Sequence, residues 1–188
     1  MLNHWRAVIW TPIWLVVVMQ GCQLGPSPSV PDLGGTYIAH AANIQVDKQT
    51  MDEIMAAFKR AEQAVLHQDL DALMAFYSES YQHRGFTKDS MRIEWENLFH
   101  EYHDFSSTHV FSSITAESDQ TPPRAQVTCT GSLWAISNAS NQRVNIDSWL
   151  GEVHYLTYEH GAWRIRGHAW EPIIVRKSQI EHPPHPYF

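Results

Sequence analysis

Apolar residues between positions 50 and 102 recur at the spacing of amphipathic helices. Thr50 and Glu53 have the spacing of a capping box, so a first helix is expected to begin there. Asp69 is placed to cap a second, shorter helix, and a third is expected to begin between Thr87 and Ser90. The apolar faces are Ile54, Phe58, Ala61 and Val65 in the first helix, Leu70, Leu73, Met74 and Tyr77 in the second, and Met91, Trp95, Leu98, Phe99 and Tyr102 in the third.

From Ser107 onward the pattern changes to the alternation that is typical of half-buried strands. Turns rich in Pro, Asn, Ser and Gly separate these strands, and their succession indicates an antiparallel meander. Helices followed by strands predict an α+β domain, in which the N-terminal helices pack on one face of a curved antiparallel sheet. The expected strands are residues 108–117, 124–136, 144–158 and 163–170.

The N-terminal segment has a different pattern, in which Arg6 precedes a mostly apolar run. From Ala7 to Met19 the run has about thirteen residues, too few for a transmembrane helix but typical of an export signal. The run is followed by Gly21 and Cys22, and the segment resembles the signal of bacterial lipoproteins, in which a lipid-modified cysteine becomes the mature N-terminus. An uncleaved anchor or an ordinary secretory signal would also export the domain.

The lipoprotein resemblance implies that Cys22 carries a lipid and that this lipid attaches the protein to the bacterial cell envelope. Because Gln23 is not aspartate, it also implies the outer membrane, with the protein facing the periplasm. The residues that follow are rich in Pro, Gly and Ser without a sustained period, which predicts a flexible tether. The expected division is a signal peptide (1–21), a tether (22–48), a globular domain (49–171) and a C-terminal tail containing Pro and His (172–188).

Charge and cysteine content narrow the range of partners. Without the signal peptide the chain has twelve Lys and Arg residues against twenty Asp and Glu, so nucleic acid is not expected as a partner. With Cys22 assigned to the lipid, Cys129 has no partner for a disulfide and is expected to be a small buried core residue. His100 and His103 are three residues apart, not four as in the His-Glu-x-x-His motif, so no metal or other cofactor is expected.

The order of elements and two short motifs resemble the nuclear transport factor two-like, or SnoaL-like, superfamily over roughly residues 50–171. The resemblance implies a cone-shaped, cystatin-like domain whose concave sheet and helices form a pocket. Some members are isomerases, dehydratases or cyclases, and others are non-catalytic binding or assembly domains, so the fold leaves activity open. The motifs are His67-Gln68-Asp69-Leu70-Asp71-Ala72-Leu73 and Gly161-Ala162-Trp163-Arg164-Ile165.

Candidate catalytic residues come from two places in the sequence. Ketosteroid isomerase-like relatives carry a general-base Asp just beyond the second helix, where this chain has no carboxylate; His83 could accept a proton there, although a position at the surface or rim is favoured. In the last hairpin, a two-residue loop at 160–161 would point Glu152 and His154 into the concavity, opposite small residues. A three-residue bulged loop would instead place both side chains outside.

Aromatic residues supply a possible ligand pocket, although most aromatics at these periods belong to a core. The leading hypothesis is an envelope lipoprotein whose non-catalytic cone domain binds a small apolar ligand or a protein partner. The alternatives are an isomerase, dehydratase or cyclase that uses a histidine-based pocket, and a subunit that forms a homodimer or larger assembly. The candidate pocket residues are Tyr81, Trp95, Tyr102, Tyr158 and Trp163.

Overall fold

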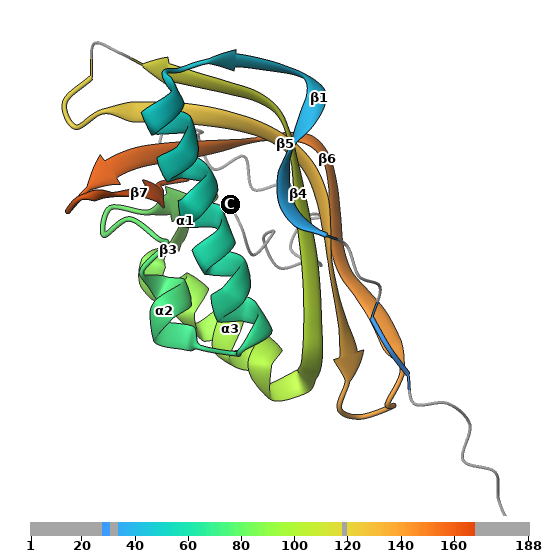
Figure 1. Ribbon diagram of the computed structural model, residues 1–188. Helices are drawn as coiled ribbons and strands as arrows, with labels where there is room; N and C mark the ends of the chain where they lie inside the picture. Colours follow the sequence, from blue (N-terminus) through green and yellow to red (C-terminus); the bar gives the residue numbers. More distant parts are fainter. Residues whose placement is uncertain (1–27, 31–33, 118–119, 168–188) are drawn as a thin grey trace, which may run out of the picture.

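The computed structural model describes residues 28–30, 34–117 and 120–167, and it confirms the α+β fold. Its main sheet has the strand order β1-β4-β5-β6-β7 and is strongly curved, with the helices on one side (Figure 1). A short antiparallel pair, β2 and β3, precedes α3. The bounds are β1 Gly35–Gln45, α1 Lys48–Leu66, α2 Leu70–Met74, β2 Gln82–His83, β3 Phe86–Thr87, α3 Lys88–Glu101, β4 Tyr102–Glu117, β5 Arg124–Ser137, β6 Arg143–Glu159 and β7 Ala162–Ile165.

Helix caps explain where the helices begin, and two of the three predicted starts are confirmed. Asp69 caps α2 by accepting the N–H of Ala72 at 3.0 Å, and Thr87 caps α3 in a capping box. The predicted start of α1 is wrong by a few residues. Asp47 caps this helix instead, because its carboxylate accepts the N–H of Thr50 at 2.8 Å.

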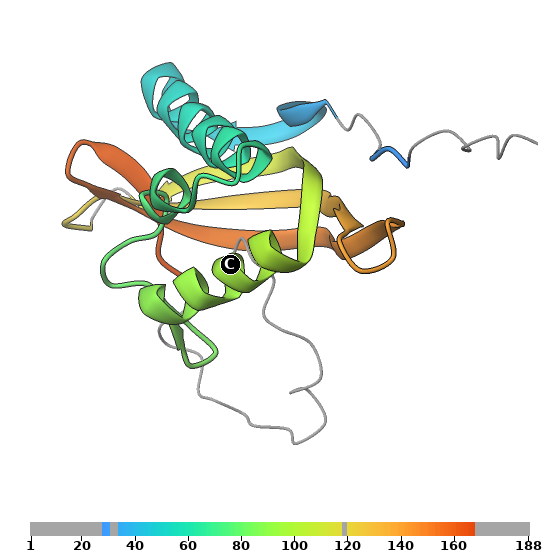
Figure 2. The same ribbon diagram turned by 90° about the horizontal axis from the view of Figure 1, so that it is seen from below.

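Strand β1 is the largest departure from the sequence analysis, which assigned its residues to the tether. It lies at the edge of the sheet, parallel to β4 and beside α1 (Figure 2). Thr108 Oγ1 donates to the carbonyl of Gly35 at 2.8 Å, and Thr36 is bonded to Glu62 of α1. The folded domain therefore begins near residue 35, and the predicted tether is shorter than residues 22–48.

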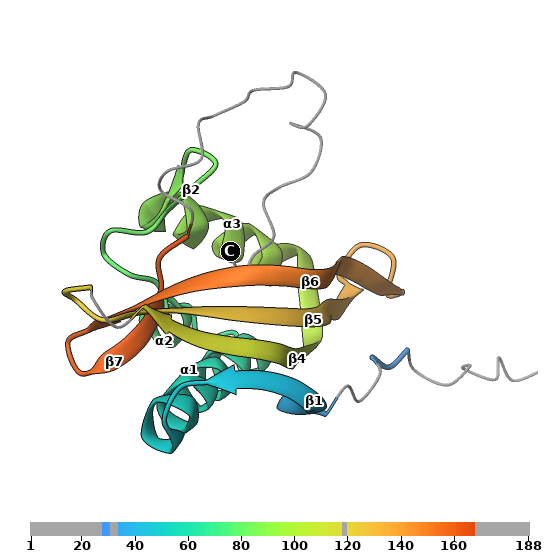
Figure 3. The ribbon, with the colours of Figure 1, turned by 90° about the horizontal axis from the view of Figure 1, so that it is seen from above.

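The remaining strands form the predicted antiparallel meander, and Figure 3 shows β4, β5 and β6 side by side. The two-residue hairpin loop is confirmed, since Tyr158 pairs with Trp163 and Leu156 pairs with Ile165. Strand β4 begins six residues before the predicted start at 108, because α3 ends at Glu101 and the chain is already extended at the next residue. Residues 168–170 of the predicted last strand lie outside the described residues.

One continuous hydrophobic core fills the space between the helices and the concave side of the sheet. Phe58 of α1 lies at its centre and makes edge-to-face contacts with Phe76 at 5.0 Å and with Phe111 at 4.8 Å between ring centroids. Every fully buried apolar residue of this core comes from positions 54–165, and Ile38 and Ile44 of β1 pack against it. The described domain thus has a complete core of its own, which is the requirement for folding independently.

The predicted signal peptide, the lipid site Cys22 and the C-terminal tail lie outside the described residues. Within the ranges that the structure describes, no helix has the length and apolar character needed to cross a membrane. The lipid anchor and the envelope location therefore stay predictions from the sequence.

Candidate functional site

A buried thiol and two aromatic nitrogens form a cluster on the concave side of the sheet. His154 Nε2 lies 2.8 Å from Cys129 Sγ, and Trp149 Nε1 donates to the same sulfur at 3.1 Å. Burial raises the pKa of the Cys129 thiol to about 12, so the sulfur keeps its proton at neutral pH and can donate it to His154. Cys129 is therefore the buried core residue that the sequence predicted, here with two polar partners.

A second buried cluster joins α1 to the first two strands of the sheet. The Glu62 carboxylate accepts the hydroxyl of Thr36 at 2.6 Å, the backbone N–H of Thr36 at 3.1 Å and Nδ1 of His109 at 3.1 Å. Burial lowers the pKa of His109, and the hydrogen bond and charge of Glu62 oppose this shift only in part. The carboxylate thus holds β1, α1 and β4 together through groups that are shielded from water.

The structure separates the two hairpin residues that the sequence placed side by side in the concavity. His154 is buried as predicted, but Glu152 is exposed. The reason is a bulge in β6. This strand advances three residues from Trp149 to Glu152, whereas the paired strand β5 advances only two residues, from Cys129 to Gly131. The bulge disturbs the alternation of side chains, so Trp149 turns inward and reaches the cysteine while Glu152 faces solvent.

The other candidates from the sequence lie mostly in the core. His83 is buried, not at the surface, because Gly167 packs directly against it and a β-carbon there would lie 3.0 Å from that of His83. Tyr81 and Trp95 are core residues, and Trp95 Nε1 donates to the hydroxyl of Tyr77 at 2.9 Å. Burial, together with the neighbouring Tyr77, raises the pKa of Tyr81. Tyr102 and Tyr158 are half-buried at the edge of this core.

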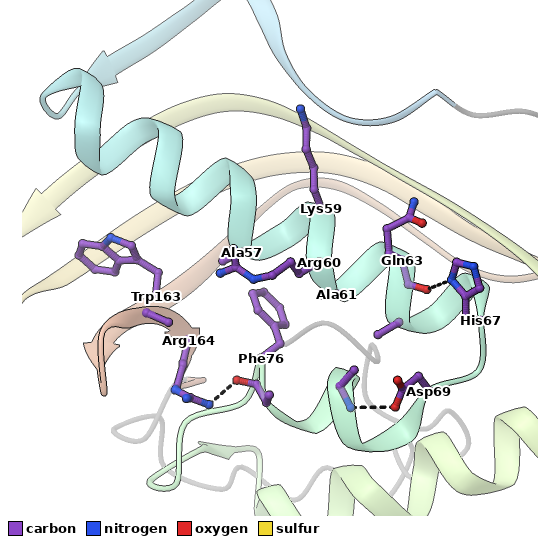
Figure 4. A pocket seen from close by; sticks show the side chains of 14 residues that line it. Ala57, Lys59, Arg60, Ala61, Gln63, His67, Asp69, Phe76, Trp163 and Arg164 are labelled. Atoms are coloured by element: carbon purple, nitrogen blue, oxygen red, sulfur yellow. Dashed lines mark hydrogen bonds between the residues drawn. The ribbon is translucent and has the colours of Figure 1, made fainter.

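A surface groove of about 600 Å³ lies between α1, α2 and β7 (Figure 4). Trp163 is the one predicted pocket residue that lines it. Alanines of the two helices and two aromatic rings form its apolar surface, and longer polar side chains stand around them. The lining residues are Ala57, Lys59, Arg60, Ala61, Gln63, Ala64, His67, Asp69, Ala72, Ala75, Phe76, Ala162, Trp163 and Arg164.

The charged groups of the groove are held in different ways. Arg60 is exposed and extends along the groove toward Trp163, whereas Lys59 points away from it (Figure 4). On the opposite side, Arg164 donates to the carbonyl of Ala75 and, at 3.4 Å, to that of Glu159. These backbone bonds fix the Arg164 guanidinium at the edge of the groove.

The sequence analysis did not predict this groove, although one part of its lining follows a recognisable sequence pattern. Ala57, Ala61 and Ala64 follow one another at i, i+4 and i+7 on α1, which makes a stripe of small residues on one face of the helix. Arg60 lies on the same helix, but Arg164 comes from a strand about a hundred residues later. Only the packing of β7 beside α1 and α2 brings the two arginines into the lining of one groove.

No model of a known protein family and no curated protein matches this sequence. Solved structures do share its fold. One is a protein from Novosphingobium aromaticivorans named provisionally as an aromatic ring hydroxylase (12% identity, TM-score 0.52, covering 65% of this chain and 88% of that one). Another is a ketosteroid isomerase-like protein from Erwinia carotovora atroseptica (16% identity, TM-score 0.51, covering 64% and 94%).

A third similar structure is a protein of unknown function with a cystatin-like fold from Nostoc punctiforme (15% identity, TM-score 0.44, covering 65% of this chain and 90% of that one). The two likenesses with TM-scores above 0.5 show that the described domain has a ketosteroid isomerase-like fold, as the sequence motifs implied. At these identities the likeness concerns the fold alone, and the function has to be argued from this chain's own residues.

Proposed function

We propose that this chain is an envelope lipoprotein whose cone domain is a binding module, and that it takes a small apolar ligand in the groove between α1, α2 and β7. The groove supports this proposal because its volume of about 600 Å³ lies within the roughly 300–1,000 Å³ of pockets that hold small molecules. Its exposed alanines, Ala72 and Ala75, offer apolar contact, and its polar rim can orient a ligand.

The observation that carries the proposal is the contrast in access between the groove and the interior. Arg60, Ala72 and Ala75 are exposed within the groove, so a ligand reaches them directly. Inside the cone, the imidazole of His154 is buried and is in contact with the thiol of Cys129. A substrate would have to displace packed aromatic side chains to reach that imidazole, which favours binding in the groove over a histidine-based isomerase.

Ligand binding is tested by native mass spectrometry of residues 23–188, a fragment that keeps every described residue, exported behind a cleavable secretion signal and gently purified from a bacterial host. We expect a copurifying small molecule. Ala72→Trp should abolish it, because the indole would occupy the groove from an exposed position on α2. Ala139→Trp adds the same side chain at an exposed turn and should leave the bound mass unchanged. Equal loss in both variants, or an empty wild-type protein, would contradict the proposal.

The lipid anchor is tested on the full chain in a bacterial host that receives an alkyne-labelled fatty acid. We expect the label on the wild-type protein, which should sediment with the outer membrane. Cys22→Ala should lose both properties, and Cys129→Ala should keep the label, because the buried thiol is not the attachment site. Label on the Cys22→Ala protein, or a wild-type protein without label, would contradict lipidation.

A further inference from the structure

We infer that the ligand of the groove is a single-chain amphiphile with an anionic head group, a carboxylate or a phosphate, held between Arg60 and Arg164 with its chain against Ala72 and Ala75. This inference rests on the proposed function of the groove and adds the chemical class of its ligand. Three features carry it, namely the local charge, the arrangement of the two guanidinium groups and the size of the groove.

The charge of the groove is opposite to that of the protein. The whole chain has a formal net charge of −7, yet the groove is lined by Arg60 and Arg164 against one acidic side chain, and the third basic residue of its lining, Lys59, points away from it (Figure 4). The acid, Asp69, uses its carboxylate to cap α2 and lies at the far end from Trp163 (Figure 4). An acidic protein with a cationic groove favours an anionic ligand at that place.

The two arginines line the groove from different elements, Arg60 from α1 and Arg164 from β7. Arg164 is oriented by its backbone acceptors, Ala75 and Glu159, while Arg60 forms no ion pair within the described residues and is free to turn toward a ligand. A guanidinium presents a planar fork of N–H donors that matches carboxylate and phosphate oxygens. We therefore place the anionic group between the two side chains, next to the Trp163 end of the groove (Figure 4).

The size of the groove and its small residues indicate one chain. Its volume of about 600 Å³ lies within the range of pockets that hold one small molecule. The alanines of α1 in the lining are almost fully buried, whereas Ala72 and Ala75 offer exposed apolar surface in the groove. An acyl chain can lie against these two residues and remove their apolar surface from water.

The test compares four twelve-carbon probes in monomeric form with residues 23–188: dodecanoate, dodecyl phosphate, dodecanol and dodecylammonium. Affinity is measured by isothermal titration calorimetry for the wild-type protein and for Arg60→Gln and Lys59→Gln. Lys59→Gln is the matched control, because it removes the same charge from the adjacent residue, whose side chain points away from the groove (Figure 4). Circular dichroism confirms that all three proteins are folded.

We expect at least one of the two anions to bind about tenfold or more tightly than dodecanol. Arg60→Gln should weaken anion binding about tenfold and leave dodecanol binding unchanged, since a hydrogen bond to a charged head group is lost. Lys59→Gln should keep the wild-type affinity for the anions. The relative affinities of dodecanoate and dodecyl phosphate then identify the head group.

Different results would overturn different statements. Binding of dodecanol or dodecylammonium as tightly as the anions would refute an anionic ligand but leave the groove as an apolar binding site. Equal weakening of anion binding by Arg60→Gln and Lys59→Gln would show that both residues act only by general electrostatic attraction. That result would refute the head-group site. If no probe binds to any protein, this inference is wrong, and the native mass spectra of the wild-type and Ala72→Trp proteins decide separately whether the groove is a ligand site.

Discussion

Polar side chains that can form hydrogen bonds lie both in the interior of the cone and in the groove beside α1. The difference between the two regions is access to water. In the interior, His109, Cys129 and His154 are shielded from water and contact other protein groups. In the groove, Arg60 is exposed and Arg164 is half-buried at the edge. A buried polar group must be hydrogen-bonded for the fold to be stable, whereas an exposed guanidinium can exchange water for a ligand. Residues in the two regions should therefore affect different properties.

The interior should control stability, and the strongest test is Phe58→Ala. Phe58 contacts the rings of Phe76, His109, Phe111 and His154, so its removal leaves a cavity at the centre of the core. We expect the free energy of unfolding to fall by about 3–5 kcal/mol in urea denaturation. Leu66→Ala, an exposed apolar residue on the same helix, should cost less than about 1 kcal/mol. Similar losses in the two variants would mean that the concave side is not tightly packed.

Substitution of Glu62 should have the next largest effect on the free energy of unfolding. Glu62→Ala leaves the N–H of Thr36 and Nδ1 of His109 without their acceptor, which should cost about 1–3 kcal/mol. Because these bonds hold β1 against α1, amide hydrogen exchange should rise mainly in residues 35–45.

The matched control for Glu62→Ala is Asp52→Ala, on the same helix. Asp52 forms an exposed ion pair with Lys48, and such pairs contribute at most about 1 kcal/mol. This variant should leave the exchange of β1 unchanged. Faster exchange spread evenly over the domain in Glu62→Ala would show that the carboxylate stabilises the whole fold and has no particular role in β1.

Strand β1 also shows a limit of prediction from the sequence. The helical periods and the caps Asp69 and Thr87 were readable, since they depend on residues close together in the chain. Strand β1 was not, because an edge strand with exposed residues such as Tyr37 lacks clean alternation. Its position depends on a bond between Thr36 and Glu62, which are 26 residues apart.

The candidate site was predictable to a smaller degree than the fold. The loop at 160–161 gave the correct hairpin register and the correct burial of His154. The bulge in β6 escaped prediction, because one extra residue in a strand changes the direction of Glu152 without a clear sequence signal. The groove was not predicted either, because Arg60 and Arg164 come to line it only through tertiary packing.

The interior should also make stability depend on pH through His109. Burial lowers the pKa of its imidazole below the ordinary histidine value of 6.5. Below pH 6.5 the unfolded chain therefore binds a proton that the folded protein excludes, so the stability contributed by neutral His109 is present above that pH and is lost as the pH falls. The slope should reach at most about 1.4 kcal/mol per pH unit for this residue.

The measurement is urea denaturation between pH 5 and pH 8 for three proteins. His109→Gln should show a flatter dependence on pH than the wild type. The control His40→Gln changes an exposed histidine on β1 and should keep the wild-type slope. If His109→Gln retains the full slope, the loss of stability in acid comes from other groups.

Substitutions in the groove should have the smallest effects on stability. Even there, the two arginines should differ. Arg60→Gln should change the free energy of unfolding by no more than about 0.5 kcal/mol, since Arg60 is exposed and has no ion pair within the described residues. Arg164→Gln should cost about 1 kcal/mol, because Arg164 bonds the backbone of Ala75 and Glu159. Urea denaturation distinguishes the two variants. Equal losses would show that Arg60 also supports the fold, so that weaker ligand binding by Arg60→Gln would no longer point to a head-group site.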